Sequence, residues 1–363
     1  MHFQLSQLHL VYFALIFWTC VRFNVASGRK NTRQGKIFSL FNIVTFEQNT
    51  CNCLSDSSIQ GTCMTKMECE NSDGGQMDGQ CAAGFGHCCM MVKNTPTALV
   101  TRNTTYLQNA EAVGRQSVPT GYTFTFNRIA NDLCQIRLDF DVFVSASPPV
   151  TGDCATSMDT LIIRSPTGRN PPVTCGTLSG QHMYFETGDT GSAGEVMIKF
   201  GASMPAKTFR IKTTYYECDN LNKAPTDCVQ YLTGLNGAFQ SYNFQGGQLI
   251  NNQNYVTCIR REMGHCSIQY AENASTTSPA FNLPPESTTA QISMCEVGLH
   301  FGSTLSGTGT NCGGVLNSVE AATEPGVVIG TLAPFQVTTL SGDVLKGTNA
   351  LAGYSIRYTQ IPC

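Results

Sequence analysis

Short segments of alternating apolar and polar residues are the clearest pattern in the chain. They cover residues 134–144, 160–164, 195–200 and 209–216, with the sequences CQIRLDFDVFV, TLIIR, EVMIKF and FRIKTTYY. Because successive side chains of a β-strand point to opposite faces of its sheet, this period of two predicts strands with one buried face. Turn-forming residues separate the segments, and no segment keeps a helical period. The pattern therefore predicts an all-β fold.

A set of landmarks built around cysteine occurs twice in the same order. The segment CQIRLDF matches CSIQYAE, a Cys-Gly pair follows in both copies, and both copies close on a strand that ends in cysteine, FRIKTTYYEC and YSIRYTQIPC. The matched cysteines are Cys134 with Cys266, Cys175 with Cys312, and Cys218 with Cys363. The repeated order indicates an internal duplication and predicts two domains of the same fold.

The duplication also predicts which cysteines pair. Equivalent positions should form equivalent bridges, and the cysteine that opens the first strand of each copy should join the one that closes the last strand. Two remaining cysteines would complete the second copy. The five predicted bridges are Cys134–Cys218, Cys154–Cys175, Cys228–Cys258, Cys266–Cys363 and Cys295–Cys312.

The chain begins with an apolar segment of the kind that directs export. Residues 1–28 contain no acidic residue, and a largely apolar run from Leu10 to Val21 is followed by the small residues of 25–28. This pattern predicts a signal peptide rather than a membrane anchor, because the run is shorter than the roughly 20 residues that span a bilayer. We expect a secreted, extracellular protein without a membrane span, with residues 29–50 as an N-terminal segment.

Charge and cysteine content narrow the class of protein. Loss of residues 1–28 removes Arg22, so 22 − 1 = 21 basic residues stand against 25 acidic ones, a net charge of −4 that does not suggest a nucleic-acid partner. Cys20 is lost with the signal, and in an exported chain the other cysteines should mostly form disulfides. No CxxC pair of a zinc site is present, so neither a metal nor another cofactor is predicted.

The cysteines fall into three groups that divide the chain into modules. The first group lies within residues 51–92, a module too small to be stable without several bridges. Residues 93–103, KNTPTALVTRN, have the composition of a linker. The two copies of the repeat then occupy residues 104–218 and 225–363.

Several of these segments carry a resemblance to a known family. The strand IRLDFDVF at residues 136–143, Cys154 ahead of Asp159, and the Cys-Gly pair at Cys175 resemble the CUB domain, an extracellular β-sandwich. From about residue 35 onward the chain is also similar to a family of secreted arthropod CUB-domain-containing proteins with a cysteine-rich head, largely of unknown function. The segments CGTLSGQHMY, APTDCVQY and CIRREMGHC carry this closer match. The resemblance implies two tandem CUB-like β-sandwiches preceded by a small disulfide-rich module.

The cysteine-rich head is similar to a clip domain. It contains the segments GTCMTKMEC and GQCAAGFGHCC, and the second of these ends in two adjacent cysteines. The similarity implies three bridges among six cysteines, namely Cys63, Cys69, Cys81, Cys88, Cys89 and one of Cys51 and Cys53. A bridge between Cys51 and Cys53 is disfavoured because a single residue separates them. We therefore expect Cys51 or Cys53 to be an odd thiol, exposed at the edge of the module and able to link two chains into a homodimer.

Two departures from the CUB pattern affect the expected chemistry. The first copy has Val100 and Phe124 near the places where CUB modules carry a cysteine pair, so packing alone should hold that edge. Of the three carboxylates that the calcium-binding members use, only Asp159 has a clear counterpart here. Calcium takes 6 to 8 oxygen ligands, so we expect calcium to have little effect on stability.

No recognisable catalytic centre occurs in the sequence. The chain lacks a GDSGG-like serine loop, an HExxH motif, a P-loop and a GxGxxG motif. We therefore expect a non-catalytic protein that binds an extracellular protein or glycan. Loop residues that combine charge or hydrogen bonding with contact area are the candidate contacts: Arg169, His182, Tyr184, Arg260, Arg261 and His265.

Two sequons, Asn103-Thr-Thr and Asn273-Ala-Ser, predict N-glycans. The leading hypothesis is a secreted recognition or adhesion protein that acts through its CUB-like domains. One alternative is a structural component of an extracellular matrix that is cross-linked by a spare cysteine. Another is a non-catalytic regulator of a protease cascade that acts through the head.

Overall fold

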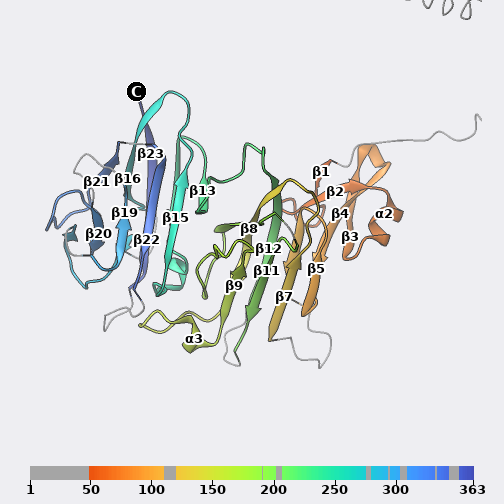
Figure 1. Ribbon diagram of the computed structural model, residues 1–363, viewed down its shortest axis with the longest axis horizontal. Coiled ribbons are helices and arrows are strands. Elements are labelled where there is room, and N and C mark those ends of the chain that lie inside the picture. Colours follow the sequence, from red (N-terminus) through yellow and green to blue (C-terminus); the bar gives the residue numbers. More distant parts are fainter. Residues whose placement is uncertain are drawn as a thin grey trace, which may run out of the picture. The chain divides into compact units, whose positions relative to one another are not determined.

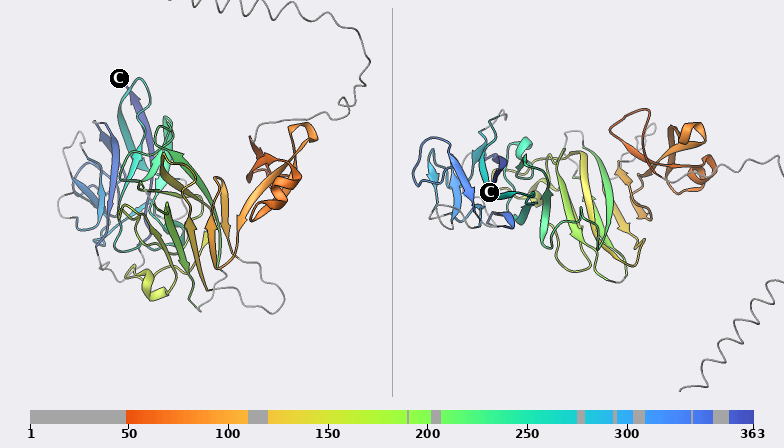
Figure 2. Two further views of the ribbon diagram at one scale, coloured as in Figure 1. Left: turned by 45° about the vertical axis from the view of Figure 1, so that its right-hand side comes forward. Right: turned by 90° about the horizontal axis from the view of Figure 1, so that it is seen from above.

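The computed structural model describes residues 49–109, 120–189, 191–201, 207–274, 279–292, 295–302, 309–331, 333–342 and 351–363. The signal peptide expected at residues 1–28 and nearly all of the N-terminal segment lie outside the described residues. No helix in the described ranges has the length and apolar character that crossing a membrane requires. In Figures 1 and 2 the chain runs from an orange head through a yellow-to-green sandwich to a cyan-to-blue one.

The first sandwich consists of two four-stranded layers. One layer has the strand order β5-β7-β11-β9, and the other has the order β6-β12-β8-β10. The two layers enclose a core that includes Tyr122, Phe124 and Phe126 from alternate positions of one strand. The elements are β5 (Thr97–Val100), β6 (Thr105–Gln108), β7 (Gly121–Phe126), β8 (Leu133–Val144), α3 (Cys154–Ser157), β9 (Thr160–Arg164), β10 (His182–Glu186), β11 (Gly194–Lys199) and β12 (Thr208–Glu217).

The second sandwich repeats this strand order. One layer runs β13-β15-β22-β19-β20-β18, and the other runs β14-β23-β16-β21, with β17 paired to β23. Its core is a separate apolar cluster. The elements are β13 (Cys228–Leu232), β14 (Asn236–Gln240), η2 (Phe244–Gly246), β15 (Asn254–Ile259), β16 (His265–Glu272), β17 (Phe281–Asn282), β18 (Ala290–Gln291), β19 (Gly298–His300), β20 (Thr310–Gly313), β21 (Val327–Gly330), β22 (Phe335–Leu340) and β23 (Gly353–Pro362).

The correspondence between the copies extends to their bridges. In both copies the central pair of the second layer, β8 with β12 and β16 with β23, is antiparallel and is closed by a disulfide at its end. The structure contains the five pairs that the repeat predicts: Cys134–Cys218, Cys154–Cys175, Cys228–Cys258, Cys266–Cys363 and Cys295–Cys312. The predicted fold class, all-β with two tandem CUB-like sandwiches behind a small disulfide-rich module, is confirmed.

The head is a small sheet held by three bridges. Its elements are β1 (Thr50–Asn52), β2 (Gln60–Met64), α2 (Lys66–Asn71), β3 (Gly75–Cys81), η1 (Ala82–Gly84) and β4 (Gly86–Lys93). The helix begins with a reciprocal capping box between Thr65 and Glu68, which satisfies two backbone N–H groups at its start. The bridges are Cys51–Cys88, Cys63–Cys81 and Cys69–Cys89.

Residues 93–103, expected to be a linker, are instead part of the sandwich. They contain β5, which pairs in parallel with β7 and brings Val100 opposite Phe126 in the core. In the other layer of the sandwich, β4 of the head pairs in parallel with the edge strand β6. The sheet of the head therefore continues into that layer. The equivalent edge of the second sandwich carries the Cys228–Cys258 bridge between β13 and β15. Packing of Val100 and its neighbours replaces that bridge in the first copy.

The odd thiol belongs to Cys53, but the expectation that it is exposed was wrong. Cys53 is 3% exposed and packs with Ile59, Cys88 and Tyr106. The chain folds back at this point, because the Cys53 N–H donates to Ile59 O at 2.9 Å and Tyr106 of β6 closes the cluster. A thiol enclosed between head and sandwich cannot reach a second chain, so the structure does not support a dimer linked through it.

The environment of Cys53 predicts low reactivity in the folded protein. Burial, together with the nearby carboxylate of Asp78, raises the pKa of the Cys53 thiol from 9.0 to about 11. At pH 8 the thiolate fraction should therefore be about a hundredfold lower than for an unperturbed thiol. We expect iodoacetamide to label native protein very slowly and denatured protein at one site, with Cys53→Ser as the unlabelled control. Rapid labelling of the native chain would contradict the buried position.

Candidate functional site

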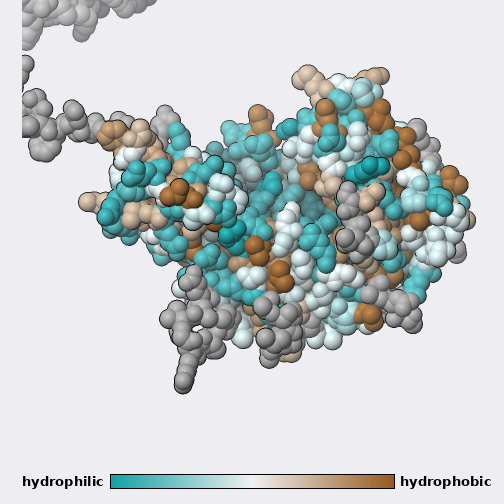
Figure 3. All heavy atoms as spheres, turned by 180° about the vertical axis from the view of Figure 1, so that it is seen from behind, coloured by the Kyte–Doolittle hydropathy of each residue, from teal (hydrophilic) through white to brown (hydrophobic). Residues whose placement is uncertain are grey.

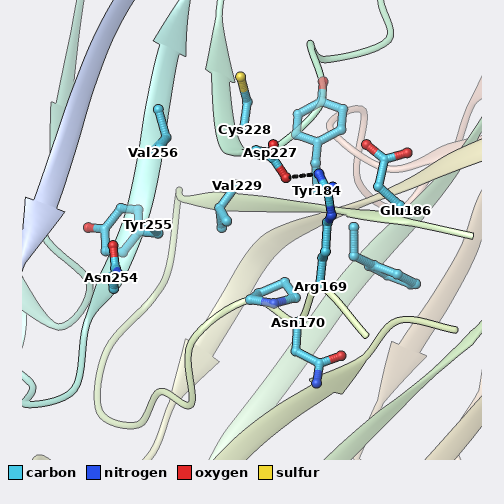
Figure 4. Close-up of a pocket in the computed structure, with 12 residues that line it drawn as sticks. Arg169, Asn170, Tyr184, Glu186, Asp227, Cys228, Val229, Asn254, Tyr255 and Val256 are labelled. Carbon is cyan, nitrogen blue, oxygen red and sulfur yellow. Dashed lines mark hydrogen bonds and ion pairs between the residues drawn. The ribbon is translucent and has the colours of Figure 1, made fainter. Parts of the chain in front are cut away.

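A groove lies where the two sandwiches meet. Its volume is about 230 Å³. The walls come from the loop after β9, from β10, from the start of β13 and from β15, and Figure 4 shows their side chains facing the same space. The lining residues are Arg169, Asn170, Pro171, Tyr184, Phe185, Glu186, Asp227, Cys228, Val229, Asn254, Tyr255 and Val256.

An ion pair between Arg169 and Asp227 crosses this groove. Arg169 extends from the first sandwich and its Nη1 donates to Asp227 Oδ1 at the beginning of the second (Figure 4). The two side chains are 60% and 62% exposed, so solvent screens the pair and its contribution to stability is small. The ion pair thus positions two hydrogen-bonding groups at the surface, where a partner can reach them.

Tyr184 forms the inner wall of the groove. It is 3% exposed, and its ring stacks on Tyr216 at 5.9 Å and meets Tyr231 edge-on at 6.4 Å. Its hydroxyl accepts a hydrogen bond from Arg137 Nη1 at 3.1 Å. Burial raises the pKa of Tyr184, so the phenol stays neutral. Tyr184 is therefore a structural wall with little surface for a ligand.

Glu186 gives the groove a net negative charge. Its Oε1 accepts from Gln135 Nε2 at 2.7 Å, which fixes the carboxylate at the end of β10. An adjoining hollow of about 420 Å³ shares Arg169 and Glu186 and adds the exposed Asp189. Across the two spaces three carboxylates accompany one guanidinium, so the surface favours a partner that presents a basic group.

His182 is buried in the contact between the sandwiches. It is 9% exposed, and its Nε2 accepts the backbone N–H of Tyr231 at 3.0 Å, while the Tyr242 hydroxyl donates to its carbonyl at 3.2 Å. Burial, and to a lesser extent the charge of Arg137, lower the pKa of His182 to about 3. The imidazole is therefore neutral and is occupied as an acceptor between the two domains.

The other three candidate residues lie together elsewhere, at the turn from β15 to β16. Arg260 pairs with Glu262 at 3.0 Å, Arg261 is exposed, and His265 Nδ1 lies 3.0 Å from Met263 O. Met263 itself is 97% exposed. The six candidate residues are therefore not one site. Arg169 and Tyr184 line the groove, His182 is buried in the domain contact, and the other three lie at the turn from β15 to β16.

His182 and Tyr184 were expected to lie in a loop, which was wrong because both belong to a strand. Residues 182–186 form β10, paired with β8, and four of its five residues are buried because the second sandwich covers the face that solvent would otherwise reach. The run HMYF is a signal for a strand buried on both faces. Asp227 and Asn254 also line the groove, but the sequence around them does not mark them as site residues. They reach the groove only because the second sandwich packs against the first.

A lysine forms an ion pair with Asp159, the carboxylate that corresponds to a calcium ligand in the CUB pattern. Asp159 is fully buried and accepts from the N–H groups of Ala146 and Gly201, each at 2.7 Å. Lys207 Nζ lies 2.6 Å from Asp159 Oδ1 and donates to Gly201 O at 2.7 Å. Within the described ranges no group of three or more His, Cys, Asp or Glu side chains is placed to hold a metal. These residues do not fit a calcium ion, because the protein's own cation balances the single carboxylate.

This pair predicts how the protein responds to calcium and to mutation. Lys207→Met should cost about 3–5 kcal/mol of unfolding free energy, because it leaves the buried carboxylate without a counter-ion. The double variant Asp159→Asn/Lys207→Met should be more stable than Lys207→Met alone. Calcium at millimolar concentration should leave the melting temperature of the wild type unchanged. A rise of many degrees in calorimetry would contradict this account.

His182 predicts a stability loss at acid pH. The folded chain keeps the imidazole neutral down to a pKa of about 3, whereas the unfolded chain takes up a proton below about 6.5. Between these values the unfolded state binds more protons, so stability is complete above pH 6.5 and falls with pH by at most about 1.4 kcal/mol per unit. His182→Gln keeps an acceptor that does not titrate and should flatten this slope in urea titrations from pH 7 to 4. Parallel curves for the two proteins would show that His182 is not the cause.

The chain is similar to several solved structures at low sequence identity and low TM-score. No curated protein matches the sequence. Among solved structures, the CUB1-EGF-CUB2 domains of rat MASP-1 are 12% identical over 72% of this chain and 99% of that one, with a TM-score of 0.25. The CUB1-EGF-CUB2 domain of human MASP-1/3 is 12% identical over 70% and 99%, with a TM-score of 0.23. The full extracellular region of zebrafish Gpr126/Adgrg6 is 10% identical over 74% and 34%, with a TM-score of 0.26.

A family model matches one part of the chain. Modules of the CUB family are generally non-enzymatic and mediate protein binding. Residues 225–361, which form the second sandwich, match the model described as the animal CUB domain.

Proposed function

We propose that this protein is secreted and acts as a non-catalytic recognition or adhesion protein. It binds an extracellular protein or glycan through its CUB-like sandwiches. The signal peptide expected at residues 1–28, the eight bridges and the CUB match of residues 225–361 support an extracellular role. The N-glycans at Asn103 and Asn273 and the modules 51–92, 104–218 and 225–363 belong to the same proposal, with β5 added to the first sandwich.

The groove crossed by Arg169 and Asp227 is the observation that carries this proposal. Both charged groups are exposed, while the walls beneath them are rigid because Tyr184 and Cys228 are buried. A surface that is held rigid before binding loses little conformational entropy on binding. On the face drawn in Figure 3, apolar residues form small separate groups among polar ones. Recognition through polar, charged contacts fits this surface.

The charge of the groove indicates which kind of partner it favours. The positive charge of Arg169 is already paired with Asp227, so the negative charges of Glu186 and Asp189 have no further cation in the lining of these two spaces to balance them. An exposed lysine or arginine of a protein partner would find carboxylates within this space. We therefore favour a protein partner that offers a basic side chain over a neutral glycan at this groove.

The two alternatives predicted from the sequence are less well supported. A matrix component cross-linked by its spare cysteine requires an exposed thiol, and Cys53 is buried. A regulator that acts through the head would use its exposed apolar side chains, among them Leu54 and Phe85, which are 83% and 62% exposed. The head can be tested in the same experiment as the groove.

Binding variants would test the groove directly. The full-length chain, biotinylated and incubated with the fluid around the cells that secrete it, should capture a partner that mass spectrometry can identify. Asp189→Lys should then weaken binding of the purified partner by about tenfold or more, because it replaces an exposed carboxylate that would face the partner's basic group with a like charge.

Two control variants locate the binding surface. Arg164→Glu reverses a charge on the same sandwich at β9, where Arg164 is 63% exposed, and should leave affinity unchanged. Phe85→Ser changes only the head. Loss of binding in Phe85→Ser with full binding in Asp189→Lys would move the site to the head and reject the groove.

A further inference from the structure

A second hollow lies between the sandwiches, on the part of the contact that contains His182. Its volume is about 220 Å³, smaller than the about 300–1,000 Å³ of pockets for drug-sized ligands. The first sandwich contributes residues 179–182 and the second contributes the rest of the lining. The lining residues of the second sandwich are Gln230, Leu232, Ala238, Phe239, Gln240, Gln245, Asn273 and Ser355.

The lining is polar and carries no carboxylate, lysine or arginine. Seven of its twelve residues have a neutral amide or hydroxyl side chain: Ser179, Gln181, Gln230, Gln240, Gln245, Asn273 and Ser355. The only titratable member, His182, is held neutral in its hydrogen bond to Tyr231. Leu232 and Ala238 add apolar surface at the same place, whereas the ring of Phe239 packs into the core of the second sandwich. Neutral donors and acceptors beside apolar side chains fit a sugar, whose hydroxyls need hydrogen bonds and whose C–H face needs apolar contact.

One buried group in the hollow has an acceptor without a protein donor. Gln181 is 8% exposed, and its Nε2 donates across the contact to Gln240 O at 3.0 Å. Its Oε1 receives no hydrogen bond from the protein. This oxygen is closed to solvent as the side chain stands, and a buried amide oxygen without a donor costs free energy, so a rotation of Gln181 that turns it towards a ligand hydroxyl in the hollow would be favourable.

The chain carries its own candidate for this ligand. Asn273, the acceptor of the second sequon, lines the hollow at the end of β16. Its backbone N–H donates to Ser355 O at 2.9 Å and its Nδ2 donates to Ser355 Oγ at 3.2 Å, which fixes the side chain against β23. N-glycosylation replaces one of the two hydrogens on Nδ2, so a hydrogen bond to Ser355 can persist beside a sugar.

We propose that the innermost N-acetylglucosamine of a glycan on Asn273 docks into this hollow between the two sandwiches. Gly180, Ala238 and Gln245 line the hollow and are exposed, so they form the mouth through which the outer sugars reach solvent. The docked sugar contacts residues 179–182 of one domain while it is bonded to the other. The glycan is thus a covalently held ligand that joins the domains. This inference rests on the proposed secretion of the protein.

Release of the glycans by a peptide-N-glycosidase tests the docking. The full-length chain is produced in an animal cell that secretes it, and the occupancy of each sequon is followed by mass spectrometry over time. Asn103 is exposed and serves as the internal comparison. In the native protein, release at Asn273 should be about tenfold slower than at Asn103, because it requires local opening, and the two rates should become similar after denaturation.

A pair of variants at the mouth separates docking from other shielding. Ala238→Phe fills the hollow and should raise the release rate at Asn273 towards that at Asn103, whereas Ala238→Ser should leave the slow rate unchanged. Ser275→Ala, which removes the sequon, should lower the melting temperature by about 2–4 °C, and Ser275→Thr, which keeps it, should not.

Three results would overturn the inference while leaving secretion intact: equal native release rates at the two sites, slow release at Asn273 in Ala238→Phe, or a secreted chain with a glycan at Asn103 alone. A chain that stays in the cell without any glycan would instead reject the proposed function. The two failures are therefore distinguishable.

Discussion

Buried amide side chains that hydrogen-bond one sandwich to the other are the interaction on which the rest of the structure depends. Gln135 makes a two-point contact with the backbone of Ala224, and Asn243 accepts the N–H of Thr177 at 2.9 Å. Gln253 reaches back to Val173 O in the same way. When the domains separate, these amides exchange their protein partners for water, so each hydrogen bond adds a net of about 0.5–1.5 kcal/mol to the contact. Both the groove and the hollow owe their walls to this contact.

The contact also decides what each candidate residue can do. Tyr184 and His182 lie on one strand, and the second sandwich encloses both of them, so Arg169 is the only one of these three candidates that keeps an exposed side chain. Domains that meet through short polar contacts usually move relative to one another. Here Tyr242 and Tyr255 of the second sandwich also belong to the core cluster of the first, which ties the domains with apolar packing as well.

The strands could be predicted from local sequence patterns, but contacts between segments far apart in the sequence could not. Residues 160–164 and 209–216 alternate with a period of two and became β9 (Thr160–Arg164) and the centre of β12 (Thr208–Glu217). Equivalent cysteines found equivalent partners because the duplicated strands impose the same geometry. In contrast, the pair of Lys207 with Asp159 spans 48 residues, and neither residue carries a mark in the sequence that identifies the other. The groove was predicted only in part, since Arg169 could be selected by residue type but Asp227 could not.

The parallel pairing of β4 with β6 gives the head a role apart from recognition. Strand β6 lies between β12 and β4, so the last strand of the head occupies the row of backbone N–H and C=O groups that would otherwise end the sheet of the first sandwich. Open strand edges of this kind pair readily with other chains and promote aggregation. The head therefore acts as a cap on the sheet, and its three disulfides keep that cap folded. Proteolysis ahead of β6 would uncover an adhesive edge, so a shortened chain would be expected to self-associate through its backbone.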